Sequence, residues 1–353
     1  MGRKVNWGII AAGGIARRRT LPAMKDVPNA VITGIMDKNQ KVLDEISEEY
    51  KITDTYTEEQ ELLNNPQIEA VYVASPVCFH KKQALEVLHA GKSLLLEKPL
   101  AMNEEDAREI VQTALKKGQT AGVAMVMKHH PAHRKMKKLI ESGVIGDIVS
   151  CRAQLNCWFP DMEGNWRQKK ATAGGGALVD MGTHCIDILK YLLDDHVEWV
   201  FGDIGTRTFS YEVDDSADCI LHMKKGATCY IDVHFNIPDE AAKGMLEIYG
   251  TKGSLLASGT IGQDGQGEVY LNQCATEGYD SNQKRKEDGL GQKVDYEREN
   301  IYGRQIEEFS KAIEEGLTVS TSFEDAFETV KIIDALYKSS KESSVSIIGE
   351  IKI

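Results

Sequence analysis

The sequence lacks the features of a membrane protein, a disulfide-rich secreted protein or a nucleic-acid binder. No apolar run among its 353 residues approaches the roughly 20 needed to cross a bilayer. Its seven cysteines are scattered, odd in number and form no C-x-x-C pair, so we expect reduced thiols in the cytoplasm and no zinc site. Positive charge is in deficit, and the net charge of −12 argues against nucleic acid or an anionic membrane as a partner.

The remaining composition is that of a globular chain long enough for about two domains. Residues 1–126 alternate short apolar runs with helical patterns, which is typical of an N-terminal Rossmann-type, doubly wound parallel sheet of the α/β class. We expect strands at Val5–Ile10, Ala30–Met36, Ala70–Ala74, Ser93–Leu96 and Ala121–Met127, with helices between them that include Asn39–Tyr50, Lys81–Ala90 and Glu104–Lys117.

The pattern changes after residue 126, and residues 127–353 are predicted to form an α+β domain on a large, mostly antiparallel, open-faced sheet. Alternation is clear in Ala227–Phe235, where every second residue is apolar. Residues 250–253 favour a hairpin turn, and Gly262–Gly291 is polar and glycine-rich, which predicts loops. Further expected elements are a strand at Ile148–Leu155 and helices at Ala132–Ser142, Ala177–Leu193, Tyr302–Glu315 and Phe323–Ser339.

Small residues gather at the first turn from strand to helix, where residues 8–16 spell GIIAAGGIA. Small residues there let backbone N–H groups and the helix N-terminus approach a pyrophosphate, although Ala11 and Ala16 replace the usual first and last glycine. Asp37 closes the second strand, where a carboxylate accepts hydrogen bonds from a ribose and repels a 2′-phosphate. The pattern predicts a dinucleotide site that favours NAD, while Lys38 and the arginines at 17–19 keep NADP possible.

Two further motifs suggest chemistry. Lys98, in Glu97-Lys98-Pro99, follows a parallel strand, and the carboxyl end of such a strand faces the crevice where ligands bind. Asp180 and His184 are four residues apart near a helix N-terminus and project from one face. A carboxylate beside an imidazole would raise the pKa of the histidine and orient it to remove a proton from a hydroxyl. Taken singly, each motif also fits a structural ion pair or a helix cap.

Together these motifs resemble the Gfo/Idh/MocA oxidoreductases over essentially the whole chain. The resemblance rests on the small-residue turn, Ser75-Pro76 with His80, Glu97-Lys98-Pro99, His130-Pro131-Ala132-His133, Asn165-Trp166-Arg167, the Asp180/His184 helix and the hairpin at Ile248–Leu255. The chain departs from the family at Ala11 and at Lys128-His129, where several relatives carry an arginine and an aromatic residue.

The resemblance implies an NAD-dependent enzyme, with NADP possible, that interconverts a secondary alcohol and a ketone on a sugar, glycoside or cyclitol. Lys98 would lie beside the reacting carbon, His184 would be the general acid/base, and Asp180 would orient the substrate or tune the histidine. The implied cofactor contacts are Ala12, Gly13, Gly14, Ile15, Ala16, Asp37, Lys38, Ser75, Pro76, His80, Glu97, Lys98, Trp166 and Arg167. The implied substrate contacts are Lys98, Lys128, Asp180 and His184.

Other readings stay open at this level. An NAD-dependent glycosidase that oxidises C3 transiently, and a non-catalytic dinucleotide-sensing regulator, would share the fold. The histidines at 129, 130 and 133 lack a matching carboxylate spacing, so we expect no metal. The family and the uncovered face of the sheet lead us to expect a homodimer or homotetramer.

Overall fold

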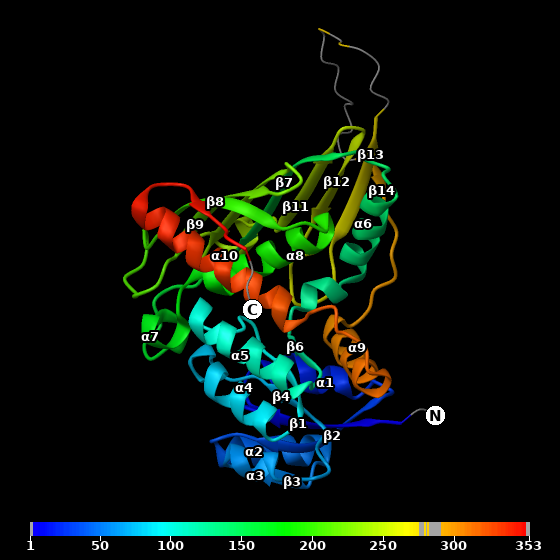
Figure 1. Cartoon of the computed structure of the whole chain (residues 1–353), viewed down its shortest axis with the longest axis vertical. Coiled ribbons are helices and arrows are strands. Elements are labelled where there is room, and N and C mark those ends of the chain that lie inside the picture. The colour runs from blue at the N-terminus through cyan, green and yellow to red at the C-terminus, as the bar shows by residue number, and fades with distance from the viewer. Residues whose placement is uncertain (1–2, 275–278, 280, 282–290, 351–353) are drawn as a thin grey trace.

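The structure is a computed structural model that describes residues 3–274, 279, 281 and 291–350. A smaller sheet and a larger sheet lie one beyond the other along the long axis of the molecule (Figure 1). No helix in these residues is both long and apolar enough to span a bilayer.

The smaller sheet has six parallel strands in the order β3-β2-β1-β4-β5-β6, as expected for a Rossmann domain. Neighbours β1 and β4 are not consecutive, so the strand order reverses between them, and ligands bind at such a reversal. The strands are β1 (Val5–Ile10), β2 (Ala30–Met36), β3 (Asp54–Tyr56), β4 (Ala70–Val73), β5 (Ser93–Leu96) and β6 (Ala121–Val123). The helices are α1 (Leu21–Met24), α2 (Gln40–Tyr50), α3 (Glu59–Leu63), α4 (His80–His89) and α5 (Glu104–Lys117).

The strand that we predicted at Ala121–Met127 is shorter in the structure. β6 ends at Val123, and Val126–His129 forms a 3-10 turn before α6 (Pro131–Glu141). The ring of His130 accepts a hydrogen bond from the N–H of Ala132 and caps α6, so the chain must already have left the sheet. A short buried apolar run does not by itself distinguish a strand from a helical turn, which explains the error.

The larger sheet has nine strands in the order β14-β13-β12-β11-β7-β10-β9-β8-β15, and only its β7–β10 pair is parallel among the described residues. β11 and β12 form the predicted hairpin. The interval Gly262–Gly291, predicted to form loops, contains the strand β13, which pairs with β12. Part of this interval lies outside the described residues. The strands are β7 (Ile148–Asn156), β8 (Val197–Gly205), β9 (Ser216–Met223), β10 (Thr228–His234), β11 (Met245–Gly250), β12 (Gly253–Ser258), β13 (Glu268–Gln273), β14 (Gln292–Lys293) and β15 (Ser346–Ile347).

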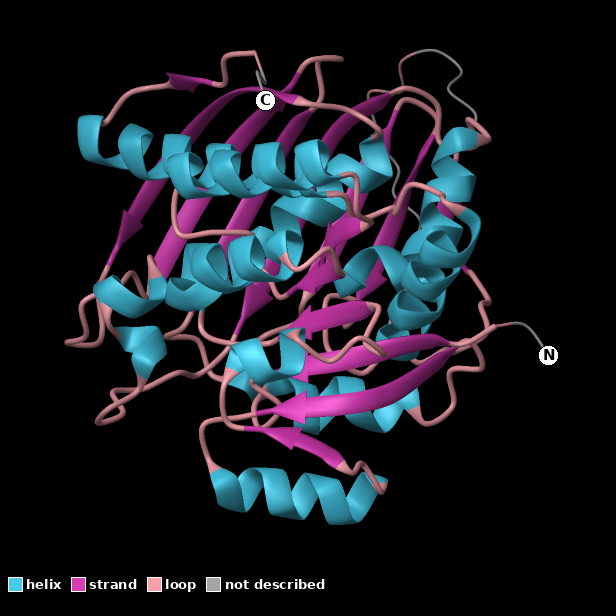
Figure 2. Cartoon of the chain, turned by 60° about the horizontal axis from the view of Figure 1, so that its bottom comes forward, coloured by secondary structure: helices cyan, strands magenta, loops and turns pink. Residues whose placement is uncertain are grey.

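Helices cover one face of this larger sheet (Figure 2). They are α6, α8 (Thr183–Leu193) and α10 (Phe323–Glu342), and a core of alternate strand residues such as Cys229 and Ile231 is buried beneath them. On the opposite face Tyr230 is 46% exposed. Ile220 and Phe201 follow it in register across β9 and β8, so this uncovered face carries an apolar row.

The C-terminal helices return to the smaller sheet and complete its cores. Phe309 of α9 (Ile301–Glu315) is buried with β1 and β2, and Phe327 of α10 is buried with β4 and β5. The N–H of Val123 in β6 donates to the carbonyl of Thr321, just before α10. The part of the chain after residue 126 is therefore needed to bury the apolar surface of the part before it.

Candidate active site

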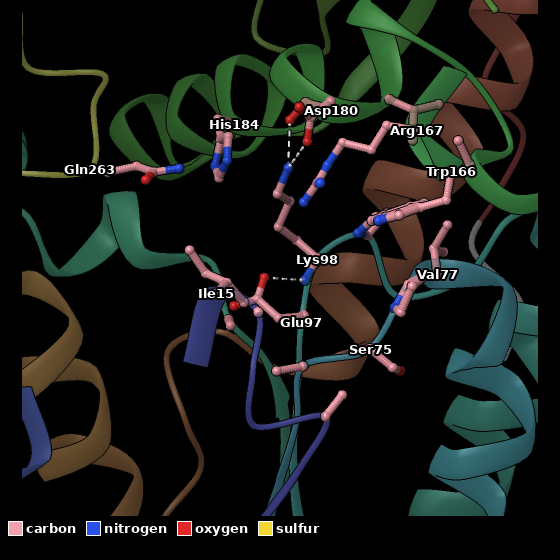
Figure 3. Close-up of a pocket in the computed structure, with 18 of the residues that line it drawn as sticks. Ile15, Ser75, Val77, Glu97, Lys98, Trp166, Arg167, Asp180, His184 and Gln263 are labelled. Atoms are coloured by element: carbon pink, nitrogen blue, oxygen red, sulfur yellow. Dashed lines mark hydrogen bonds and ion pairs between the residues drawn. The ribbon is translucent and has the colours of Figure 1, made fainter. Parts of the chain in front are cut away.

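A cavity of about 620 Å³ lies at the carboxyl ends of β1, β4 and β5, facing the start of α8 (Figure 3). Its lining comes from both halves of the chain. Eleven of the residues predicted for the site line it: Gly14, Ile15, Asp37, Ser75, Pro76, Glu97, Lys98, Trp166, Arg167, Asp180 and His184. The motifs that resemble the family in the sequence are thus brought to one place by the fold.

The small-residue turn after β1 has the form that a pyrophosphate requires. Ala11 takes a positive φ of 62°, the left-handed conformation that glycine adopts more readily. The helical turn Ala16–Thr20 begins with no side-chain cap, so no capping side chain occupies its first N–H groups. These features fit a dinucleotide, although Ala12 and Ala16 are buried in the core and are not part of the lining.

Asp37 points its carboxylate at this turn. Its Oδ2 accepts from the N–H of Gly13 at 2.9 Å, and its Oδ1 accepts from the N–H of Asn39 at 3.0 Å. Lys38 turns away and its Nζ meets Glu58 at 2.7 Å on the surface. The acidic side chain therefore lies at the cavity and the adjacent basic one does not.

His80 supports the cavity from behind and does not line it. Its Nδ1 lies 2.8 Å from the carbonyl of Pro99 and its Nε2 lies 3.0 Å from the carbonyl of Ser75. Burial lowers the pKa of His80 to about 4, so the ring is neutral and donates to one of the two carbonyls. It ties the turn after β4 to the turn after β5, where the Lys98–Pro99 peptide bond is cis.

Glu97 belongs to a buried chain of hydroxyl groups. Tyr72 donates its hydroxyl to Glu97, and Thr20 donates to the hydroxyl of Tyr72 at 3.3 Å. Burial raises the pKa of Glu97, against the opposing effects of the Tyr72 hydrogen bond and the charge of Lys98. The carboxyl group is thus fixed in orientation at the floor of the cavity.

Lys98 and Asp180 form the central ion pair. The ammonium of Lys98 donates to Oδ1 of Asp180 at 2.5 Å and to its backbone carbonyl at 2.8 Å. Asp180 lies in a π-helical turn, Leu178–Gly182, directly before α8. Burial would raise the pKa of Asp180, but the charges of Lys98 and Arg167 outweigh it and the pKa is lowered. Asp180 is therefore a carboxylate at neutral pH.

His184 lies one turn further along the same helix, near Lys98. Burial lowers its pKa and the charge of Lys98 lowers it further, against a weaker opposing effect of Asp180. Asp180 does raise the pKa of His184, as expected, but burial and the charge of Lys98 outweigh this effect. The carboxylate of Asp180 accepts from Lys98, and among the described residues it makes no hydrogen bond that would orient the His184 ring. Nδ1 of His184 is buried without a hydrogen-bond partner in the described chain. His184 is consequently neutral and able to accept a proton.

Lys128 does not reach the cavity, so the geometry does not support a substrate contact for it. Its side chain is 4% exposed and its Nζ pairs with Asp187 at 3.0 Å and with Asp325. Lys190 joins the same buried group through Asp325 at 2.8 Å and Glu328 at 2.9 Å. Two opposing carboxylates draw the ammonium toward α8 and α10 and away from the site.

Several lining residues carry no local signal in the sequence. Phe159 and Phe235 come from chain just beyond β7 and β10, Gln263 from the loop after β12, and Tyr302 from α9. Only Phe235 could have been found, because the alternation of its strand places it on the buried face. The others depend on how distant segments meet.

The histidines around residue 130 do not form a metal site. The rings of His130 and His133 lie 4.8 Å apart and are buried. Within residues 3–274 and 291–350, no group of three or more histidine, cysteine, aspartate or glutamate side chains could hold a metal ion.

Comparison with known proteins identifies both halves of the chain. Residues 5–125 match the family described as "Oxidoreductase family, NAD-binding Rossmann fold". Residues 133–256 match the family described as "GFO/IDH/MocA C-terminal domain". The 1,5-anhydro-D-fructose reductase of Ensifer adhaerens is 30% identical over 272 residues, covering 77% of this chain and 81% of that protein. The levoglucosan dehydrogenase of Pseudarthrobacter phenanthrenivorans is 27% identical over 348 residues, covering 89% and 88%.

Solved structures show the same fold. A levoglucosan dehydrogenase in complex with NADH and levoglucosan superposes with a TM-score of 0.87 at 24% identity, covering 99% of this chain and all of that one. The aldose-aldose oxidoreductase from Caulobacter crescentus gives a TM-score of 0.87 at 20% identity, covering 98% of this chain and 100% of that one.

Proposed function

The chain belongs to the Gfo/Idh/MocA family of NAD-binding sugar oxidoreductases, and we propose that it interconverts a secondary alcohol and a ketone on a ring substrate with NAD as the preferred cofactor. The observation that carries the proposal is the convergence of Lys98, Asp180 and His184 at one end of a cavity whose other end is the dinucleotide turn. An ammonium, a carboxylate and a neutral imidazole are the groups that alcohol oxidation needs.

NAD, when bound, supplies the hydride acceptor; the residues of the chain supply position and proton transfer. Asp37 favours NAD because its carboxylate would repel a 2′-phosphate, and Lys38 is held at the surface by Glu58. Glu97, Trp166 and Arg167 line the same cavity and are proposed to hold the nicotinamide end. Ser75 and Pro76 line it from the end of β4.

The neutral ring of His184 accepts the hydroxyl proton of the substrate during oxidation and returns it during reduction. The ammonium of Lys98 donates a hydrogen bond to the same oxygen and stabilises the negative charge that develops there. Asp180 holds Lys98 through its carboxylate and its carbonyl, so two of the three N–H bonds of the ammonium have partners. The third has none among the described residues and is available to the substrate.

The test is steady-state oxidation of ring alcohols by the variants Lys98→Met and His184→Ala. We expect Lys98→Met to abolish turnover and His184→Ala to lower kcat by about 10²–10⁴. Both should bind NADH with affinity close to that of the unmodified enzyme, measured by quenching of tryptophan fluorescence. Near-normal turnover in either variant would refute the assigned roles. Glycoside cleavage with no net NADH would instead favour the NAD-dependent glycosidase.

We further propose that the enzyme is a cytoplasmic homo-oligomer. All seven cysteines are free, as expected in a reducing compartment. The apolar row on the uncovered face of the larger sheet suits burial against a second copy.

A further inference from the structure

The wall of the cavity opposite the dinucleotide turn is mainly apolar. The parallel pairing of β7 and β10 brings the chain beyond each strand together, where the N–H of Phe159 donates to the carbonyl of Phe235. The two rings lie 4.9 Å apart and both line the cavity. Met127, Val126 and Val179 add further apolar side chains to the lining.

Few polar side chains interrupt this wall. The proposed function assigns Lys98, Asp180 and His184 to the reacting hydroxyl and the hydroxyl next to it. It assigns Trp166 and Arg167 to the cofactor. Among the other described lining residues of the second half of the chain, Gln263 stands out, because Tyr302 lies beside Glu97 on the cofactor side. Figure 3 shows Gln263 extending from its loop into the cavity near His184.

Gln263 is positioned to donate. Its Oε1 accepts from Nε of Arg19 at 3.3 Å, which leaves the amide NH₂ of Gln263 for a ligand. Arg18 also lines the cavity, but it comes from the helical turn that follows the dinucleotide turn. A hydroxylated ring placed against the apolar wall therefore finds partners for hydroxyls along one edge only. Its remaining hydroxyls would face phenyl rings and aliphatic side chains, where a polar group loses its hydrogen bonds with water.

We propose that the substrate is a ring alcohol with an apolar face, such as a deoxy or anhydro sugar or an alicyclic diol, rather than a fully hydroxylated cyclitol or aldose. The apolar face lies on Phe159 and Phe235, and two neighbouring hydroxyls lie along Lys98, His184 and Gln263. This inference rests on the proposed alcohol–ketone conversion and narrows its substrate class.

The first experiment compares kcat/KM for NAD⁺ reduction by pairs that share a ring and differ in hydroxyl count. The pairs are trans-1,2-cyclohexanediol with myo-inositol, and 1,5-anhydro-D-glucitol with D-glucose. We expect the less hydroxylated member to be favoured by about tenfold in each pair, because each additional hydroxyl that faces the apolar wall loses its hydrogen bonds with water, and an apolar pocket rejects an added hydroxyl by up to about 10². Preference for myo-inositol or glucose overturns this inference alone, whereas no NADH from any ring alcohol overturns the proposed function as well.

The second experiment tests the polar edge with Gln263→Ala. Gln263 is exposed, so its removal leaves the core intact. We expect the ratio of kcat/KM for trans-1,2-cyclohexanediol over cyclohexanol to fall about tenfold, because only the diol uses the amide. Gln266→Ala, an exposed glutamine of the same loop outside the lining, is the matched control. An unchanged ratio in Gln263→Ala would show that the second hydroxyl does not meet this amide and would refute the assigned edge.

Discussion

At the scale of single residues, the site depends on how burial and one lysine set the charges of Asp180 and His184. The ammonium of Lys98 keeps Asp180 ionised against the effect of burial, while burial and the same ammonium keep His184 neutral. Two neighbouring groups are thus held in the forms that proton acceptance needs, without any hydrogen bond between them in the described structure.

This charge state predicts the pH dependence of alcohol oxidation. A lowered pKa means that His184 remains an unprotonated base as the pH falls through the usual histidine range near 6.5. We expect kcat/KM to stay level from pH 7.5 to about 5.5, with its acid limb below that interval. Initial rates in buffers of constant ionic strength measure the profile. An acid limb centred near 6.5 that disappears in His184→Gln would contradict the assigned environment.

At the scale of elements, the buried charges around Lys128 attach the helix that carries His184 to the rest of the molecule. Asp187 is on α8, Asp325 is on α10, and Lys128 follows the lining residue Met127. Lys128→Met would leave Asp187 buried without its cation, which costs about 3–5 kcal/mol in known cases. Urea unfolding should show a loss of this size, and Lys82→Met, at an exposed ion pair, should cost less than about 1 kcal/mol. Equal losses in both variants would exclude the anchoring role.

How much could be predicted from the sequence also differs by element. The parallel strands β1, β4 and β5 follow from local apolar runs, and Gly14, Ser75 and Lys98 beyond their ends line the cavity. Ala12, Ala16 and His80, predicted as cofactor contacts, are buried behind it. Lys128 was misplaced because its partners Asp187 and Asp325 are distant in sequence, and no local pattern shows which of two directions a long side chain takes. The aromatic wall has no local signal for a similar reason: β7 and β10 pair residues that are 78 positions apart in the sequence.

At the scale of the whole molecule, the uncovered face of the nine-stranded sheet predicts the state of assembly. We expect light scattering to give a mass of two or four times 39.1 kDa. Ile220→Glu would place a charge in the middle of the apolar row, between Tyr230 and Phe201, and should lower that mass. Leu115→Glu, at a 57% exposed position on α5, is the control and should leave the mass unchanged. A stable 39 kDa species in the unmodified enzyme would refute the assembly.

The return of the C-terminal helices to the smaller sheet also determines how the cavity can open. Hinge motion requires two rigid bodies joined by a flexible segment. Here α10 contacts α5 on one side and β8 on the other, and Phe327 is fully buried. Rotation of the two halves would expose that ring and its neighbours to water. Substrate and cofactor must therefore enter without a rotation of the two halves. The exposed 3.3 Å hydrogen bond between Arg19 and the lining residue Gln263 can break at small energetic cost and without disturbing either core.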